Sequence, residues 1–129
     1  MDTNVHESEL LFSEEVYQII GFALKILNEG GHGFHEKIYE NGLVVEFKKT
    51  KIEYLQQPDY KIEYEGEVLG IFRPDLISHG KIVIDTKTID RITDHERGKM
   101  INYLRKTEKR LGLIINFKYA KIEWERIVL

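Results

Sequence analysis

Asp85 and Lys87 stand two residues apart at the end of the apolar run Ile82–Ile84. In a β-strand, side chains two residues apart leave the same face of the sheet. A carboxylate and an ammonium group at the mouth of a buried strand are unfavourable unless they pair with each other or bind a further group. The strand expected over Lys81–Lys87 therefore predicts a charged site at its end, and the alternative is an exposed ion pair.

Asp75 is predicted to join this site because of where the chain turns back. Arg73-Pro74-Asp75 interrupts the strand expected over Val68–Ile77. Because proline cannot donate to a strand ladder, such a break belongs at a sheet edge or a bulge. The turn at His79-Gly80 folds the two strands together, and Asp75 and Asp85 each lie about five residues from its centre. The two aspartates are therefore predicted to meet at one level, unless Asp75 is simply a polar residue beside a turn.

Glu36 begins a helix expected over about Glu36–Lys49, on the same face as Leu43 and Phe47. It is predicted to point toward the sheet, and the alternative is a first-turn charge that complements the helix dipole. Three carboxylates and a lysine fit a hard cation such as Mg²⁺ or Mn²⁺, which prefers oxygen ligands. Such a metal would polarise a phosphoryl oxygen and acidify a bound water, and the lysine would orient that water or stabilise developing charge.

The elements that must position these residues follow from apolar periodicity. A helical stripe from Val16 to Leu27, with Ser13 as the expected N-cap and Gly30-Gly31 as the stop, predicts the first helix. Thr93 is expected to cap another helix over about Asp94–Lys106. Strands are predicted in Ile52–Tyr54, Tyr60–Tyr64, Val68–Ile77, Lys81–Lys87, Leu111–Phe117 and Ile122–Leu129. This order indicates an α/β (α+β) fold with a mixed central sheet flanked by helices, and not a doubly wound fold.

Length and composition exclude several other classes of protein. The 129 residues fit a single domain, expected over residues 13–129 after a flexible or partly helical segment at residues 1–12. The absence of cysteine excludes disulfides and cysteine-based zinc sites, and it fits a cytoplasmic protein. No apolar run approaches the roughly 20 residues of a membrane span, so no membrane association is expected.

Nucleic-acid binding would require a local basic face, because the formal net charge is −3. Cationic residues gather around the helix expected after Thr93, and others follow the second helix. They are Arg97, Lys99, Arg105, Lys106, Lys109 and Arg110, with Lys48, Lys49 and Lys51. The alternative is a solvated charged surface without a partner.

The segment Gly33-Phe34-His35-Glu36-Lys37-Ile38-Tyr39 resembles the signature of the GxxExxY protein family. Further resemblances follow in order in Gly70–Leu76, Lys81–Lys87, Asn102–Leu104 and Leu111–Phe117. That family is similar to the PD-(D/E)XK nuclease-like superfamily, so the resemblance implies a restriction-endonuclease-like αβββαβ core. It also implies a hydrolase: a Mg²⁺- or Mn²⁺-dependent nuclease acting on DNA or RNA.

The resemblance further implies roles for individual residues. Asp75 is similar to the aspartate that follows the family's proline, Asp85 and Lys87 to its (D/E)XK pair, and Glu36 to the glutamate of its first core helix. Glu36, Asp75 and Asp85 are therefore expected to be metal ligands, and Lys87 the fourth catalytic residue. Asp85 departs from the pattern, because the family more often has glutamate there.

Substrate contacts are expected from Arg73, Lys99 and Tyr103. Lys99 stands where the family often has glutamine, four residues before the tyrosine, so it either weakens substrate engagement or adds a phosphate contact.

Two alternatives to a nuclease acting as a single chain remain open. One is a catalytically silent nuclease-fold module that binds nucleic acid or a protein partner; the other, compatible with either function, is a homodimer formed through the exposed aromatic strand Ile52–Tyr64.

Overall fold

The computed structural model describes residues 11–129, so the segment expected over residues 1–12 lies outside the described part except for Leu11 and Phe12. The elements follow one another as α2 (Ser13–Gly30), α3 (Glu36–Thr50), β1 (Tyr54–Gln56), β2 (Tyr60–Tyr64), β3 (Glu67–Phe72), β4 (Leu76–Ser78), β5 (Ile82–Lys87), α4 (Asp94–Thr107), β6 (Leu111–Asn116) and β7 (Glu123–Val128). The predicted α+β class is confirmed. No helix in this range is long and apolar enough to cross a membrane.

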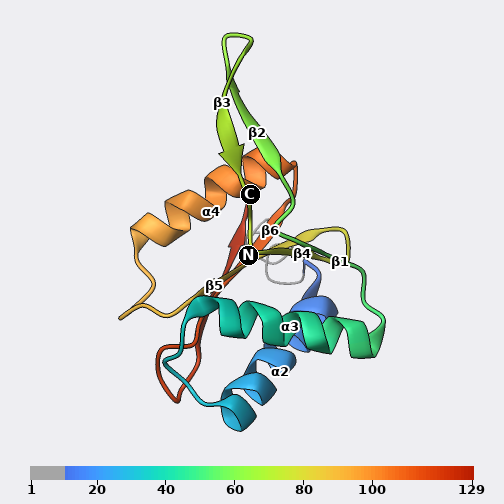
Figure 1. Cartoon of the computed structure of the whole chain (residues 1–129), viewed down its shortest axis with the longest axis vertical. Coiled ribbons are helices and arrows are strands. Elements are labelled where there is room, and N and C mark those ends of the chain that lie inside the picture. Colours follow the sequence, from blue (N-terminus) through green and yellow to red (C-terminus); the bar gives the residue numbers. More distant parts are fainter. Residues whose placement is uncertain (1–10) are drawn as a thin grey trace, which may run out of the picture.

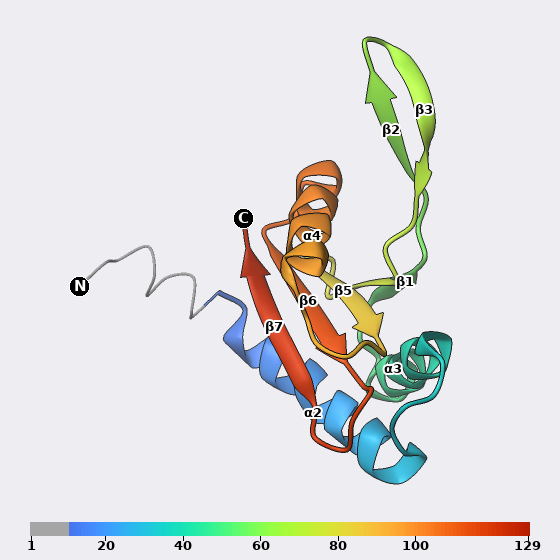
Figure 2. The same cartoon turned by 90° about the vertical axis from the view of Figure 1, so that its left-hand side faces the viewer.

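The main sheet has the strand order β1-β4-β5-β6-β7. Only β5 and β6 run parallel, and the other pairs are antiparallel, so the sheet is mixed as predicted. A parallel pair needs a crossover connection, and α4 provides it. Figures 1 and 2 show α4 on one face of this sheet and α2 with α3 on the other. The central strands β5 and β6 are buried along nearly their whole length, as their continuous apolar sequences indicate.

Alternation along β5 divides the core into two parts. Ile82 and Ile84 face α2 and α3, whereas Val83 faces α4. Because side chains two residues apart share a face, Asp85 and Lys87 lie on the α4 side of the sheet. Thr86 lies on the α3 side, where its hydroxyl group approaches the first residue of that helix. The end of β5 therefore presents polar groups to helices on both faces.

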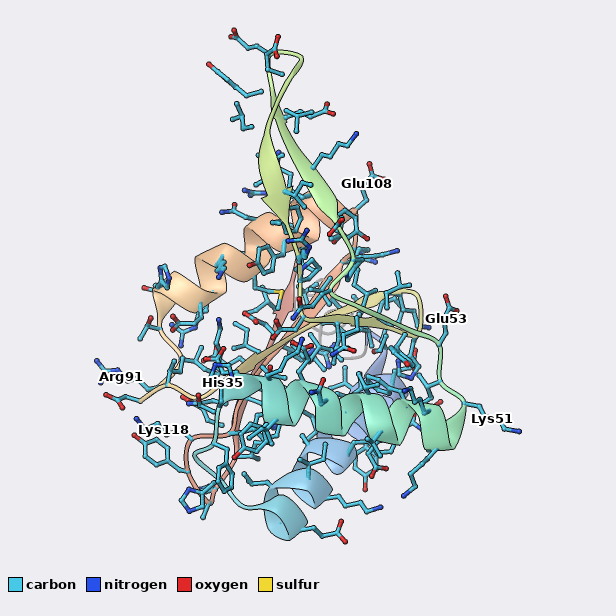
Figure 3. The ribbon with its side chains drawn as sticks, viewed as in Figure 1. His35, Lys51, Glu53, Arg91, Glu108 and Lys118 are labelled. Atoms are coloured by element: carbon cyan, nitrogen blue, oxygen red, sulfur yellow. The ribbon has the colours of Figure 1, made fainter. Side chains whose placement is uncertain are left out.

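The two helices that flank the site begin at side-chain caps. His35 caps α3 by accepting a hydrogen bond from the backbone N–H of Lys37, and Lys51 follows the other end of this helix (Figure 3). The predicted cap of α4 is confirmed, since Thr93 forms a capping box with Glu96. The cap predicted for α2 is wrong. Ser13 is already the first helical residue, and the residue before it is Phe12, whose side chain has no acceptor for a capping hydrogen bond and packs against the core.

Tyr39, the tyrosine of the Gly33–Tyr39 segment, has a structural role. Its hydroxyl group donates to the carbonyl oxygen of Gly31 and accepts from the backbone N–H of Phe34. Its ring stacks on Phe117, with the two ring centroids 4.3 Å apart. Gly31 and Gly33 both have positive φ, which favours glycine in the loop that this tyrosine holds. The loop fixes where α3 begins, and so it fixes the position of Glu36.

The strands β2 and β3 form a separate two-stranded sheet that extends past α4 (Figures 1 and 2). We call residues 60–72 the arm. The prediction of one strand over Val68–Ile77 paired with Lys81–Lys87 is wrong in part, because the chain breaks at Arg73–Asp75 and only β4 joins β5. The strands expected over Ile52–Tyr54 and Tyr60–Tyr64 belong to different sheets. The first corresponds to the edge strand β1, which begins at Tyr54, and the second to β2 of the arm. Tyr64 is 62% exposed near the arm's tip.

Gly112→Ala is expected to lower the free energy of unfolding by about 1–3 kcal/mol. Gly112 lies on β6 beneath α4, and an added Cβ would come within 2.4 Å of Met100 Sδ and 2.7 Å of its Cγ. Gly98→Ala is the matched control on α4, since nothing lies within 4 Å of its Cβ position. It should raise stability by up to about 1 kcal/mol. Urea unfolding measures both, and an unchanged Gly112→Ala midpoint would contradict the close packing of α4 on β6.

Candidate active site

Asp75 and Asp85 lie opposite each other at the end of the β4–β5 pair. This pair joins Leu76 to Ile84, so the next residue on each strand beyond that pair is an aspartate. The carboxylate of Asp75 accepts two hydrogen bonds through Oδ2, one from the backbone N–H of Thr86 at 2.8 Å and one from its hydroxyl group at 3.0 Å. Asp85 is only 5% exposed. The two aspartates therefore meet at one level, as the position of the turn predicts.

Burial raises the pKa of Asp75 from its ordinary value of 3.8 to about 7, and the neighbouring charge of Asp85 adds to the effect. Two carboxylates this close share a proton more readily than they both ionise. A bound cation would compensate the second negative charge and displace that proton. This environment is suited to a divalent cation.

The metal-free protein is expected to lose stability as the pH rises from about 4 to about 7. Over this range the unfolded chain releases the Asp75 proton while the folded chain retains it, so the folded state binds more protons. Asp75→Asn should remove this part of the pH dependence and raise the free energy of unfolding at pH 8 by about 1–3 kcal/mol. The measurement is urea unfolding in EDTA at several pH values. A stability profile identical to that of the wild type would contradict the assignment of the retained proton.

Lys87 lies beside this pair on the same face of the sheet. Its Nζ is 3.4 Å from Asp85 Oδ2, and only 16% of the lysine side chain is exposed. Burial by itself lowers the pKa of Lys87, but the carboxylates of Asp85 and Glu36 outweigh burial and hold this pKa above its ordinary value. Lys87 therefore carries a positive charge next to the paired aspartates. The alternative of an exposed surface pair does not describe it, because both side chains are largely buried.

Glu36 lies at the same end of the sheet, at the start of α3. Its Oε1 accepts a hydrogen bond of 3.3 Å from the backbone N–H of Thr88, and its carbonyl oxygen accepts one of 3.4 Å from the Thr86 hydroxyl group. These contacts join the beginning of α3 to the end of β5. They place the Glu36 carboxylate near Lys87, whose pKa it raises. Its position as a first-turn acid in α3 also agrees with the helix-dipole interpretation.

Glu40 is a further carboxylate that sequence reasoning missed. It is 2% exposed, and its charge contributes to raising the pKa of Asp75. Its carboxylate accepts hydrogen bonds from Lys37 Nζ at 2.7 Å and from the side-chain amides of Gln56 and Gln57. The signal was present in the helical pattern, because Glu40 precedes the buried Leu43 by three residues.

The donor set fits a hard divalent cation held mainly by two carboxylates. Within residues 11–129, no group of three or more His, Cys, Asp or Glu side chains is arranged to hold a metal ion. The structure therefore brings Asp75 and Asp85 together and leaves Glu36 outside a shared three-carboxylate cluster. Mg²⁺ commonly uses one or two carboxylates and completes its shell with water and substrate phosphate. The Asp75–Asp85 pair meets this requirement.

The three predicted substrate contacts lie around the arm. Arg73 stands at the arm's root, and its Nε is 2.5 Å from Asp59 Oδ1. Tyr103 on α4 stacks against Phe72 of the arm, with ring centroids 5.1 Å apart, and Lys99 Nζ lies 5.6 Å from the Tyr103 centroid. Lys99 and Tyr103 are thus brought together, whereas Arg73 is already paired with a carboxylate.

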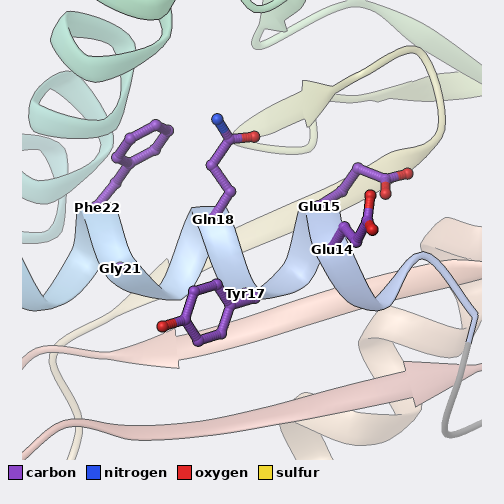
Figure 4. A pocket seen from close by; sticks show the side chains of 6 residues that line it. All are labelled: Glu14, Glu15, Tyr17, Gln18, Gly21 and Phe22. Atoms are coloured by element: carbon purple, nitrogen blue, oxygen red, sulfur yellow. The ribbon is translucent and has the colours of Figure 1, made fainter.

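Two other surface hollows contain none of the predicted site residues. One of about 530 Å³ runs along α2 and carries the carboxylates of Glu14 and Glu15 (Figure 4). All its lining residues belong to that helix, and Glu15 forms an ion pair with Lys81. The other is near the end of β6 and includes Tyr119 and Trp124. Neither hollow is therefore part of the candidate site at the end of β5.

Comparison with known protein families shows which family this chain belongs to. The family profile of the PD-(D/E)XK nuclease superfamily matches residues 13–127. The chain belongs to this superfamily. Pro74-Asp75 and Asp85-Thr86-Lys87 stand in the order of the pattern that names the PD-(D/E)XK superfamily. The PD-(D/E)XK assignment agrees with the mixed sheet and with both aspartates at one end of it.

The fold of this PD-(D/E)XK chain was also compared with solved structures. The crystal structure of SSO0001 is similar, with a TM-score of 0.56 and 20% sequence identity, over 71% of this chain and 48% of that chain. Likeness at this identity shows the fold alone, and the chain spans about half the length of that relative. Among curated proteins, none matches this PD-(D/E)XK chain.

Proposed function

We propose that this protein is a divalent-metal-dependent nuclease that hydrolyses phosphodiester bonds in DNA or RNA. One observation carries the proposal: Asp75 and Asp85 lie opposite each other at the end of the buried strand β5, with Lys87 Nζ 3.4 Å from Asp85 Oδ2. Membership of the PD-(D/E)XK nuclease superfamily supports it. The proposal includes membership of the GxxExxY family, which the resemblance of Gly33–Tyr39 to that family's signature supports.

In this proposal, Asp75 and Asp85 are the protein's ligands to Mg²⁺ or Mn²⁺, and Glu36 contacts a water in the metal's shell. When bound, the metal lowers the pKa of a coordinated water and polarises the phosphoryl oxygen. Thr86 holds the Asp75 carboxylate in place through two hydrogen bonds. Lys87 orients the attacking water or stabilises the negative charge that develops on the phosphoryl group. Burial of the site strengthens these interactions.

The substrate would approach across the α4 side of the sheet, because Asp85 and Lys87 lie on that face. Lys99 and Tyr103 on α4 are the proposed contacts there. Arg73 would contact a phosphate after exchanging its present partner, Asp59. The Lys99 ammonium supplies positive charge near the aromatic ring of Tyr103, which favours the interpretation of Lys99 as an added phosphate contact.

Cleavage of a substrate panel tests this function. The panel holds single-stranded, double-stranded, nicked and branched DNA together with RNA, each incubated with Mg²⁺, Mn²⁺ or EDTA. We expect cleavage of at least one substrate with either metal and none in EDTA. Purified protein that binds the panel but cleaves no member with either metal would contradict the proposed activity.

A silent nuclease-fold module is the second candidate. The ion pair between Lys87 and Asp85 favours it, because this pair satisfies both charges without a metal. Such a protein would bind nucleic acid or a protein, alone or as a homodimer. It would cleave nothing in the panel and would bind no divalent cation at millimolar concentration.

A further inference from the structure

A hollow of about 400 Å³ lies between the base of the arm and α4. Two residues of the arm, Ile62 and Phe72, form one wall. The other wall consists of four residues of α4: Lys99, Asn102, Tyr103 and Lys106. These four follow helical spacing, so they share one face of the helix. The hollow therefore combines aromatic and aliphatic surface with two ammonium groups and an amide.

Two of the lining residues, Phe72 and Tyr103, belong to a column of stacked aromatic rings. Tyr60 stacks on Phe72 with ring centroids 5.4 Å apart, and Phe72 stacks on Tyr103 at 5.1 Å, the latter pair inclined by only 15°. A flat aromatic ring can extend such a column at its end. Lys99 Nζ lies 5.6 Å from the Tyr103 centroid, so a positive charge is already associated with this ring.

The surface around the hollow is positively charged on α4 and negatively charged on the outer half of the arm. Lys99 and Lys106 are exposed, and neither has an ion-pair partner within residues 11–129. The outer half of the arm carries only acidic charges, at Glu63, Glu65 and Glu67. A duplex lying along the arm would bring its phosphates close to these carboxylates. A single strand can instead contact the two lysines and avoid the tip.

We propose that this hollow binds one unpaired nucleotide of a DNA or RNA strand. The base stacks on the ring of Tyr103, Asn102 hydrogen-bonds to the base edge, and Lys99 and Lys106 neutralise the flanking phosphates. Aromatic stacking of this kind accepts every base, because each has a π-face. A paired base can enter only after it leaves its stack, which requires energy. The inference rests on the proposed function and specifies its substrate class as single-stranded or frayed strands.

The hollow is close to the proposed catalytic pair along the chain. Phe72 precedes Asp75 by three residues, so their Cα atoms are at most about 11 Å apart. Both α4 and the Asp85 and Lys87 side chains lie on the same face of the sheet. A nucleotide held in the hollow would therefore direct its neighbouring phosphodiester toward the aspartates.

Fluorescence of 2-aminopurine tests the proposal, since stacking on an aromatic ring quenches it. Single-stranded and blunt duplex oligonucleotides, in DNA and RNA versions, are titrated in EDTA so that no hydrolysis occurs. We expect quenching of the single strands, and at least tenfold weaker binding of the duplex. The DNA and RNA versions identify which strand the hollow prefers.

Three variants locate the binding. Tyr103→Ala should lose the quenching and bind single strands at least about tenfold more weakly, in line with the value of a base–aromatic stack. Tyr103→Phe should retain the quenching, because the ring and not the hydroxyl group makes the contact. Tyr64→Ala replaces an exposed tyrosine of the arm that lies outside the hollow. It is the matched control and should behave as the wild type.

Salt dependence tests the two lysines without altering the aromatic column. Two phosphate contacts on a single strand predict a slope of log K against log salt of about −1.4, and Lys106→Gln should reduce its magnitude by about 0.7. Because Lys106 is exposed, this variant folds even where Tyr103→Ala does not. An unchanged slope in Lys106→Gln and Lys99→Gln would overturn the assignment of phosphates to these residues.

Other outcomes separate this inference from the proposed function. Equal affinity for duplex and single strands, or full quenching in folded Tyr103→Ala, would overturn the nucleotide site even if the wild type hydrolyses its substrate with Mn²⁺. Quenching that depends on Tyr103, without hydrolysis of any substrate, would support the nucleotide site and contradict the nuclease.

Discussion

Asp85→Asn is expected to lower the rate of metal-dependent hydrolysis by at least about 10²–10³-fold. The change keeps the shape of the side chain and removes the charge that would hold the metal opposite Asp75. It also removes the partner of Lys87, so the lysine no longer has its ion pair on β5. Initial rates of oligonucleotide cleavage with Mn²⁺ measure the effect, with circular dichroism to establish folding.

Asp90→Asn provides the control for Asp85→Asn. Asp90 is an exposed aspartate that follows the end of β5 and forms an ion pair with Lys118. Because it lies outside the buried pair, its replacement should leave the cleavage rate within about twofold, as is usual for a surface ion pair. A folded Asp85→Asn variant that cleaves as fast as Asp90→Asn would rule out Asp85 as a metal ligand.

Lys87→Met should reduce turnover by about 10²–10⁴-fold while leaving metal affinity unchanged or increased. The methionine keeps the apolar part of the side chain but cannot orient a water or stabilise an oxyanion. Since Lys87 Nζ is 3.4 Å from Asp85 Oδ2, its positive charge opposes that of an incoming cation. Losing it should favour metal binding. Cleavage rates and Mn²⁺ affinity, measured on the same preparation, separate the two effects.

Two other lysine variants sharpen this test. Lys87→Arg preserves the charge but has a planar group with different geometry, and it should recover only part of the lost activity. Lys81→Met alters a lysine that pairs with Glu15 on the surface before β5, and its activity should remain normal. A Lys87→Met variant with normal turnover would mean that the lysine only balances the charge of Asp85.

Local rules were sufficient to predict the meeting of Asp75 and Asp85. The tight turn at His79-Gly80 determines the register of the strands on each side, so counting outward from it placed both aspartates at one level. The same reasoning placed Lys87 on the face of Asp85, because alternation in a strand is strict. The continuous apolar sequence of β5 correctly indicated a strand buried on both faces.

The parts that were not predicted depend on contacts between distant segments. The helical pattern of α3 indicates that Glu40 faces the core, but the amides of Gln56 and Gln57 that satisfy its carboxylate come from β1 and its connection to β2, and nothing near Glu40 indicates them. The arm leaves the main sheet at Arg73–Asp75, although the alternating sequence of β2 looks like that of any half-buried strand. The start of α2 was misplaced because packing of Phe12 replaced the expected cap of Ser13.

Titration of Mn²⁺ against the metal-free protein, followed by the electron paramagnetic resonance signal of free Mn²⁺, tests the central claim most directly. We predict saturable binding by the wild type in the millimolar range or tighter, and loss of that binding in both Asp75→Asn and Asp85→Asn. Binding should weaken as the pH falls below about 7, because the proton held by Asp75 then competes with the metal. No binding by the wild type at millimolar Mn²⁺, or binding by the folded variants as tight as that of the wild type, would contradict a metal site at Asp75 and Asp85.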